Sequence, residues 1–258
     1  MDAPALIDRD IFAAFAEGEA TYWWFAARRA ILRRLVDAVV PVRPGRTVLD
    51  IGCGVGSTLT AFHPDFACVG YDPSPDAVEF ARKRHPQFDL HAGSADAATA
   101  RVSHADVVLL NDVIEHVPDD RALLHGVVAA MKPGAVLVVT VPADMRLWSP
   151  HDERMGHYRR YDLPLLAHAV AGMPLETLLA SPFMARLYPI VRAVRMVSQR
   201  RGKAAGVSGI DMRVPPAPVN ALLRRIFAGE SARLLAVLAG RARPYTHGVS
   251  LVALYRRT

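Results

Sequence analysis

The chain has 258 residues, of which 52% are hydrophobic and 22% charged, with 17 Gly, 19 Pro and 2 Cys. This composition excludes a disordered chain, a collagen-like repeat and a disulfide scaffold, and the length suffices for a full hydrophobic core. The net charge of +6 is uneven. Residues 1–143 carry 13 Lys and Arg against 18 Asp and Glu (net −5), whereas residues 144–258 carry 18 against 7 (net +11). The basic half predicts an anionic partner, with solvated surface as the alternative.

The chain lacks the usual signals of export and membrane insertion. Its N-terminus, MDAPALIDRD, has no basic region followed by an apolar stretch, and no run approaches the ~18–20 apolar residues of a membrane-spanning helix. Cys53 and Cys68 are too few for a disulfide framework, which fits a reducing compartment. We therefore expect a cytoplasmic protein.

The first half of the chain predicts a helix followed by alternating strands and helices. Apolar residues recur at helical spacing over residues 10–40, and Pro41 ends this pattern. Short apolar runs then predict strands at 47–51, 67–71, 88–91, 105–110 and 135–141, with helical stretches between them at 57–62, 76–84 and 121–131. Continuous apolar strands alternating with helices are typical of an α/β fold whose parallel sheet is covered on both faces.

The second half departs from this alternation. After a polar loop at 143–161, we expect a helix at 163–170 capped by Asp162 and a strand at 175–180. Apolar residues then keep near-helical spacing over 183–197, and a flexible linker follows at 202–209. We expect helices over 219–238, interrupted at Gly229, and a last strand at 248–255. The predicted organisation is an N-terminal helical lid (1–45), a core (46–182), an inserted helical cap (183–247) and a last core strand (248–258).

The sharpest local signal is VLDIGCGVGS at residues 48–57, where a strand ends and a helix begins. Open parallel sheets bind ligands at this place, and glycines let the backbone turn tightly and approach a ligand closely. The pattern, with Asp50 followed by Gly52, Gly54 and Gly56, differs from the dinucleotide fingerprint G-x-G-x-x-G because Ser57 stands where its last Gly or Ala belongs.

Polar residues also end the next three strands. Asp72 follows Gly52 by 20 residues, where a carboxylate can accept hydrogen bonds from both hydroxyls of a ribose. Asp96, next to Ala97, is placed to accept from an adenine amino group, and Asn111 to hold the amino acid end of a cofactor. A lone Asp after a strand is more often a helix cap, but four successive strand ends carrying such groups make a much stronger signal.

These motifs together resemble the class I S-adenosylmethionine-dependent methyltransferases. The similarity rests on VLDIGCGVGS, VGYDPSPDAVEFAR, GSADA, ADVVLLNDVIEHVPDD and MKPGAVLVVTVP, which lie in the family order across residues 47–143. Within the class, the chain looks like the group that includes the quinone-biosynthesis methyltransferases. The resemblance implies a Rossmann-like seven-stranded sheet of order 3-2-1-4-5-7-6 with strand 7 antiparallel. It also implies S-adenosylmethionine as cofactor, bound by Asp50, Gly52, Gly54, Gly56, Asp72, Asp96, Ala97 and Asn111.

The flanking segments resemble a narrower bacterial branch that commonly carries only a general methyltransferase assignment. They are EATYWWFAARR (19–29), GHYRRYD (156–162), PVN (218–220) and Glu230. This likeness covers nearly the whole chain and says little about the substrate.

The catalytic residues expected are two histidines. The sulfonium of S-adenosylmethionine is already activated, so the protein mainly aligns donor and acceptor, and a base is needed only when the nucleophile carries a proton of high pKa. His157 is the first candidate because it lies in the compact polar run HYRRY, and His116, in IEHVP, is the second; His151 is a third. The alternative for each is an ordinary surface or capping histidine.

The segment 112–116 offers side chains that can bind a metal, but we do not expect one. Asp112-x-x-Glu115-His116 places three ligand types within one helical turn, similar to the Glu-x-x-Glu-His, with a further His downstream, of some quinone and RNA-end methyltransferases. Here the first acid is the shorter Asp, which weakens the match, and the alternative is an ordinary helix start after the fourth strand.

Two further segments have both a functional and a structural interpretation. Trp23, Trp24 and Phe25 predict an aromatic lid, with Arg28 or Arg29 reaching a carboxylate or phosphate, or else a helix that packs in the core. The basic, amphipathic stretch 183–203 predicts a cap on the domain, with peripheral membrane contact as the alternative. Nucleic acid is an unlikely partner, because Lys is nearly absent and the basic residues are not interleaved with aromatic residues.

We therefore predict a methyltransferase that acts on a small-molecule or lipid-linked, anionic acceptor, by O-methylation. The alternatives are C-methylation of a quinone-like ring and a non-catalytic S-adenosylmethionine-binding module; a dehydrogenase would instead require tight binding of a nicotinamide cofactor. The sequence does not indicate the oligomeric state.

Overall fold

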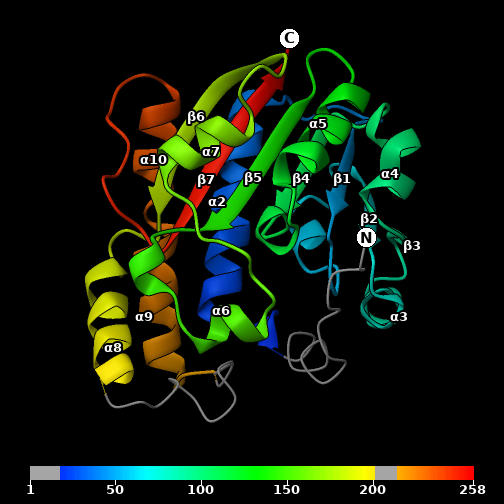
Figure 1. Ribbon diagram of the computed structural model, residues 1–258. Coiled ribbons are helices and arrows are strands. Elements are labelled where there is room, and N and C mark those ends of the chain that lie inside the picture. The colour runs from blue at the N-terminus through cyan, green and yellow to red at the C-terminus, as the bar shows by residue number, and fades with distance from the viewer. Residues whose placement is uncertain (1–17, 201–213) are drawn as a thin grey trace.

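A seven-stranded mixed sheet forms the centre of the molecule (Figure 1). The computed structural model describes residues 18–200 and 214–258. The strand order is β3-β2-β1-β4-β5-β7-β6, which confirms the predicted order. The strands are β1 (Thr47–Ile51), β2 (Ala67–Asp72), β3 (Asp89–Ala92), β4 (Val107–Asn111), β5 (Val136–Pro142), β6 (Leu175–Phe183) and β7 (Ser250–Arg257).

The pairing of the strands follows from the chain connections. Strands β1 to β5 pair in parallel, because each pair is joined by a crossover, whereas β7 is antiparallel to both β5 and β6. In the register, Asp50 of β1 lies opposite Gly70 of β2 and Leu109 of β4. The end of β1 is thus flanked by the ends of two strands that run in the same direction.

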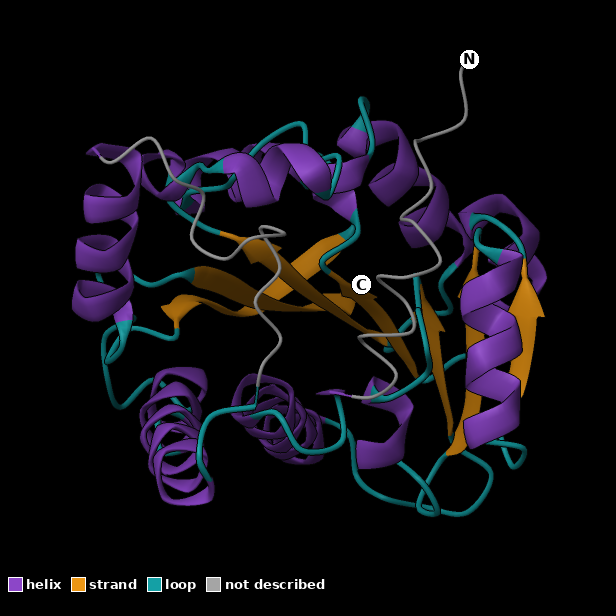
Figure 2. Cartoon of the chain, turned by 90° about the horizontal axis from the view of Figure 1, so that it is seen from below, coloured by secondary structure: helices purple, strands orange, loops and turns teal. Residues whose placement is uncertain are grey.

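Helices cover both faces of the sheet, as Figure 2 shows from below. One hydrophobic cluster joins the sheet to α2, α3, α9 and α10, and a second joins its other face to α4, α5 and α7. The helices, with the 3-10 helices marked η, are α2 (Trp23–Val39), η1 (Thr58–Ala61), α3 (Pro75–Arg84), α4 (Ala95–Val102), η2 (Ile114–His116), α5 (Asp120–Ala130), η3 (Met145–Leu147), α6 (Pro150–Arg154), α7 (Leu163–Ala169), α8 (Tyr188–Arg200), α9 (Ala217–Ala228) and α10 (Ser231–Leu238).

Several helix ends are where the sequence places them. The Asp162 carboxylate accepts a hydrogen bond from the Leu165 N–H at 2.8 Å and caps α7, as predicted. Helices α9 and α10 are separated at Gly229 and Glu230, in agreement with the predicted interruption. The linker expected at 202–209 and the part of the first helix before residue 18 lie outside the described residues.

The expectation of a helix beginning at Phe183 is wrong. Strand β6 extends to Phe183, which pairs with Ser250, and the chain turns through Met184 at a positive φ of 56° before α8 begins at Tyr188. The buried Glu230 holds this turn, because its Oε1 accepts the Arg186 N–H at 2.8 Å. Pro189 therefore lies in the first turn of α8, where a proline is tolerated.

Helix α2 packs as a core helix on the face that also carries α9 and α10. Ile31, Leu32 and Leu35 are fully buried within the first cluster. No helix in the described ranges 18–200 and 214–258 is long and apolar enough to cross a membrane.

The start of α2 is held by a residue almost 200 positions away. The Trp23 N–H donates to Asn220 Oδ1 at 3.0 Å, and Asn220 Nδ2 donates to the Thr21 carbonyl at 2.8 Å. The Trp23 ring meets Phe227 edge-on at 6.2 Å between centroids. The aromatic motif near the N-terminus and the segment PVN in α9 are therefore two halves of one contact, which joins α2 to the insertion between β6 and β7.

We expect Asn220→Ala to lower the free energy of unfolding by about 1–2 kcal/mol, because a helix N-terminal N–H and a carbonyl both lose a partner. Urea denaturation monitored by circular dichroism measures this change. Asn220→Asp keeps an acceptor for the Trp23 N–H and should lose less. A wild-type midpoint for Asn220→Ala would contradict the assigned role.

Candidate functional site

The glycine-rich loop follows β1 at the carboxyl edge of the sheet, where the strand order reverses between β1 and β4. Gly52, Gly54 and Gly56 all have positive φ, at 78°, 53° and 80°. A Cβ on Gly52 would come within 2.5 Å of Val113 Cγ2, so this position has no room for a side chain. The loop therefore exposes backbone, and it does so at the ligand-binding edge of the fold.

Asp72 is fixed beside this loop. Its Oδ2 accepts the Gly54 N–H at 2.8 Å and its Oδ1 accepts the Ser74 N–H at 2.9 Å. Burial raises the pKa of Asp72, and the two backbone hydrogen bonds oppose this shift. Each carboxylate oxygen keeps a further lone pair, so the group can still accept hydrogen bonds from a ligand.

Asp50 and Asn111 form the floor of the site, at the ends of β1 and β4. They are 1% and 7% exposed. Asp50 Oδ1 and Asn111 Nδ2 are buried and have no hydrogen-bond partner among the described residues. Burial raises the pKa of Asp50 to about 7, against the opposing charge of Arg28. Buried polar atoms without partners are uncommon and point to a ligand that supplies the partners.

Asp96 and Ala97 occupy the first turn of α4, directly after β3, and both are exposed. The Gly93 N–H donates to the Asp72 carbonyl at 2.9 Å, which joins the ends of β2 and β3. The parallel register thus brings the predicted cofactor residues of β1, β2 and β4 together and places Asp96 at the outer end of the same row.

Arg28 enters the site from α2. Its guanidinium pairs with Asp112, the residue after Asn111, and lies 4.6 Å from the centroid of the Trp24 ring. Arg28 is 8% exposed, and Asp112 has a positive φ of 54°. The arginine therefore meets a carboxylate of the chain itself, whereas Arg29 donates to the Glu19 carbonyl at 2.8 Å. The Arg28–Asp112 pair was not predicted from the sequence.

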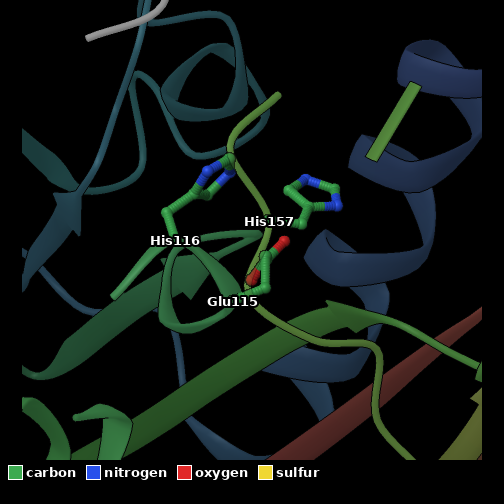
Figure 3. Close-up of side chains that lie close together, drawn as sticks. All are labelled: Glu115, His116 and His157. Carbon is green, nitrogen blue, oxygen red and sulfur yellow. The ribbon is translucent and has the colours of Figure 1, made fainter. Parts of the chain in front are cut away.

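Three side chains meet beyond this pair: Glu115, His116 and His157 (Figure 3). One ligand-type atom from each lies within 4.8 Å of the others, and the two imidazole centroids are 4.7 Å apart. Both catalytic candidates are thus brought together, although 41 positions separate them in the sequence. His151 lies farther out, 6.3 Å from His157 between ring centroids.

Glu115 is the most buried member of this cluster. It is fully buried, and neither carboxylate oxygen has a hydrogen-bond partner among the described residues. Burial raises the pKa of Glu115 well above its ordinary value, and the charge of Asp112 adds to this shift. Burial also lowers the pKa of His116 to about 4.

Asp152 holds His157 in place. The Asp152 Oδ1 lies 2.9 Å from His157 Nδ1 and accepts from Arg160 Nε at 2.8 Å. Because an ionised carboxylate only accepts, Nδ1 is the donor and Nε2 is the nitrogen that can accept a further bond. Asp152 is itself fixed by α6, since it forms a capping box with Ser149. In the sequence, Asp152 could be found only through this capping box, Ser149-Pro150-His151-Asp152. Such a box indicates the start of a helix and not a partner for a catalytic histidine.

A second network connects the end of β5 to α8. Asp144 has a positive φ of 62°, and its carboxylate accepts from the Tyr188 hydroxyl and, at 2.9 Å, from Arg146 Nε. These hydrogen bonds from Arg146 and Tyr188 outweigh burial and lower the pKa of Asp144 to about 2. The network positions the loop that carries α6 and His157.

The chain matches a family model described as a methyltransferase domain over residues 24–176. A similar curated protein is the trans-aconitate 2-methyltransferase of Methylobacterium radiotolerans, 37% identical over 112 residues, which are 42% of each chain. The chain spans about half the length of these curated relatives.

Solved structures share the fold at low sequence identity. The geranyl diphosphate C-methyltransferase of Streptomyces coelicolor A3(2), in complex with Mg²⁺, geranyl diphosphate and S-adenosyl-L-homocysteine, superposes with a TM-score of 0.55 at 13% identity, over 87% of this chain and 77% of that one. The [4+2]-cyclase SpnF superposes with a TM-score of 0.58 at 16% identity, over 99% and 97% of the two chains. At these identities the likeness concerns the fold alone.

We expect Asp144→Asn to destabilise the protein at neutral pH only. The pKa of Asp144 is depressed in the folded state, so its contribution is present above about pH 4 and is lost as the pH falls toward 2. Asn tolerates the left-handed backbone, so the substitution removes charge without new strain. Unfolding at pH 7 should become easier by about 1–2 kcal/mol, and the difference from wild type should vanish near pH 2.

Thermal unfolding followed from pH 2 to pH 8 measures this dependence. Asp162→Asn is the matched control, because Asn caps a helix as well as Asp does, and α7 should be unaffected. A difference between Asp144→Asn and wild type that stays constant down to pH 2 would contradict the assignment.

Proposed function

Because the chain belongs to the methyltransferase-domain family, within the class I S-adenosylmethionine-dependent enzymes, we propose that it methylates an oxygen of a small, anionic acceptor. The observation that carries the proposal is the contact between His116 and His157, whose ring centroids are 4.7 Å apart. His116 lies five residues after Asn111 in the sequence. This places groups that can act on a proton immediately after the floor of the cofactor site.

The residues at the sheet edge fit S-adenosylmethionine. The cofactor offers an ammonium, a carboxylate, two ribose hydroxyls and an adenine amine. The unpartnered Asp50 Oδ1 can accept from a cationic group, and the unpartnered Asn111 Nδ2 can donate to an oxygen. Asp72 remains able to accept from the ribose, and the exposed Asp96 from the adenine amine. Gly52, Gly54, Gly56 and Ala97 complete the proposed cofactor contacts as small residues.

When bound, the cofactor supplies an activated methyl group on a sulfonium. The chain has to hold the acceptor in line and exclude water. The buried Arg28, covered by Trp24, pairs with the half-buried Asp112, and the two form one wall between α2 and the strand ends. In this proposal His157 is the base for a hydroxyl acceptor, because Asp152 orients its Nδ1 and leaves Nε2 free, and His116 is the second catalytic residue.

Charge supports an anionic acceptor. The substrate side of the molecule comes from residues 144–258, whose net charge is +11. The Arg146 side chain, next to the end of β5, is 65% exposed. The relatives named trans-aconitate 2-methyltransferase take their name from a small tricarboxylate.

A lipid-linked acceptor and peripheral membrane contact are favoured instead by α8, where Ile190, Val194 and Val197 are 61%, 52% and 46% exposed on one face.

Two alternatives differ in chemistry. C-methylation of a quinone-like ring would use the same cofactor, and a non-catalytic module would bind it without turnover. The [4+2]-cyclase that shares this fold illustrates why the fold does not decide the reaction. Incubation with S-adenosylmethionine labelled in its methyl group and a panel of hydroxy acids and di- and tricarboxylic acids separates the three. Label transferred to oxygen supports the proposal, label on carbon supports the first alternative, and binding without transfer supports the second.

We expect Asp72→Ala to weaken S-adenosylmethionine binding by about 10- to 100-fold, because hydrogen bonds between the ribose and a charged acceptor are lost. Isothermal titration calorimetry measures the affinity. Asp96→Ala, which removes a side chain with no hydrogen-bond or ion-pair partner among the described residues, should have a smaller effect in the same direction.

Asp89→Ala is the control for cofactor binding, because Asp89 lies at the opposite, amino end of β3. Its affinity should equal that of the wild type. Unchanged binding in Asp72→Ala would refute the proposed cofactor site.

For a hydroxyl acceptor, we expect His157→Ala to lower kcat by at least about 100-fold while S-adenosylmethionine binding is unchanged, because a positioned base is lost. Formation of S-adenosylhomocysteine measures the rate. Alkaline release of labelled methanol identifies a methyl ester, which a carboxylate acceptor would give without any base. An unchanged kcat in His157→Ala with a hydroxyl acceptor would exclude the catalytic role.

A further inference from the structure

We propose that Glu115, His116 and His157 form a binding site for one divalent transition-metal ion. Their ligand-type atoms lie within 4.8 Å of one another, and Figure 3 shows the three side chains pointing toward one another. Two atoms that share a cation at about 2.1 Å lie at most about 4 Å apart, so a movement of less than about 1 Å completes the site. This inference departs from the expectation drawn from the sequence, where no metal was expected.

The burial of Glu115 is an independent reason to expect a cation. Its carboxyl group is fully buried, and neither oxygen has a hydrogen-bond partner among the described residues. A buried carboxyl group in this state has given up its hydration without compensation. A cation placed between Glu115 and the two imidazoles would supply the missing partner.

The neighbouring charges leave Glu115 as the acid that is open to a cation. Asp112 pairs with Arg28, and Asp152 pairs with Arg160. Each of these acids is already neutralised by an arginine at the site. Because Asp112 is paired with Arg28, it is not a ligand in this proposal. The ligand set is therefore Glu115 and His116 from the segment 112–116, together with His157 from the loop after β5.

The donor set indicates the class of metal. Two imidazoles and one carboxylate suit zinc and other first-row divalent ions, whereas Mg²⁺ and Ca²⁺ prefer oxygen ligands. His157 has the support that metal-binding histidines require, because Asp152 holds Nδ1 and leaves Nε2 for the ion. Three protein ligands leave at least one position open for a further group.

The open position deepens the proposed function, on which this step rests. An acceptor hydroxyl bound there would have a lowered pKa, as water does on zinc. The hydroxyl proton passes to solvent water, the oxygen attacks the methyl carbon, and the carbon–sulfur bond breaks with both electrons going to sulfur. In the metal-loaded protein His157 is a ligand and the ion activates the hydroxyl, whereas in the metal-free protein His157 is the base of the proposed function.

The test is a titration of the metal-free full chain with Co²⁺, without cofactor or acceptor. Visible absorption reports Co²⁺ bound by nitrogen and oxygen ligands, and competition with Zn²⁺ gives the zinc affinity. We expect one ion per chain. Glu115→Gln and His157→Ala should each weaken binding by at least about 100-fold, and Asp152→Asn, which removes the charge that orients His157 and also pairs with Arg160, by about 10- to 100-fold.

His151→Ala is the matched control, because His151 lies near the cluster without belonging to it, and it should bind Co²⁺ like the wild type. Circular dichroism and S-adenosylmethionine binding verify that the variants fold. The absence of stoichiometric binding, or equal affinity in all variants, would overturn the metal site and leave the base role of His157 untouched. Metal binding without methyl transfer would uphold the site and overturn the proposed function.

Discussion

The ion pair between Arg28 and Asp112 is the contact on which the arrangement of the site depends. It joins α2, which comes before the sheet in the chain, to the residue after β4, and Trp24 covers the guanidinium. Burying the Arg28 guanidinium without this partner would cost considerable free energy. The positive φ of Asp112 adds backbone strain, which the surrounding structure has to maintain. The pair therefore holds the first helix over the strand ends.

The consequences of this pair extend in two directions. On the β1 side, burial raises the pKa of Asp50 and the charge of Arg28 opposes this shift. On the acceptor side, the pair neutralises Asp112 and leaves Glu115 as a buried acid without a partner. Another ion pair, between the buried Asp152 and Arg160, supports His157. Arg160 holds the Asp152 carboxylate, and the carboxylate in turn holds the His157 imidazole.

The α/β class and the glycine-rich loop could be predicted from the sequence because their signals are local, whereas the strand order followed from the resemblance to the methyltransferase class. Apolar strands, glycines of positive φ and polar strand ends each follow from a few neighbouring residues, and parallel pairing then aligns them at one edge. The predicted strand order is confirmed, and the strand ends differ by only a few residues. The start of α8 was misplaced because Phe183 has the apolar character of both a strand and a helix, and its pairing with Ser250 decides between them.

Three of the missed contacts join residues that are distant in the sequence. Asn220 caps α2 across 197 positions, Arg28 finds Asp112 across 84, and His157 meets His116 across 41. The uneven charge of the two halves does not say which arginines are free, since Arg28 and Arg160 are already paired inside the protein. The sequence by itself determined the sheet, its order and the class of cofactor. Only the tertiary structure decided which charges remain unpaired in the site, because pairing depends on distance in space and on burial, which neither composition nor spacing records.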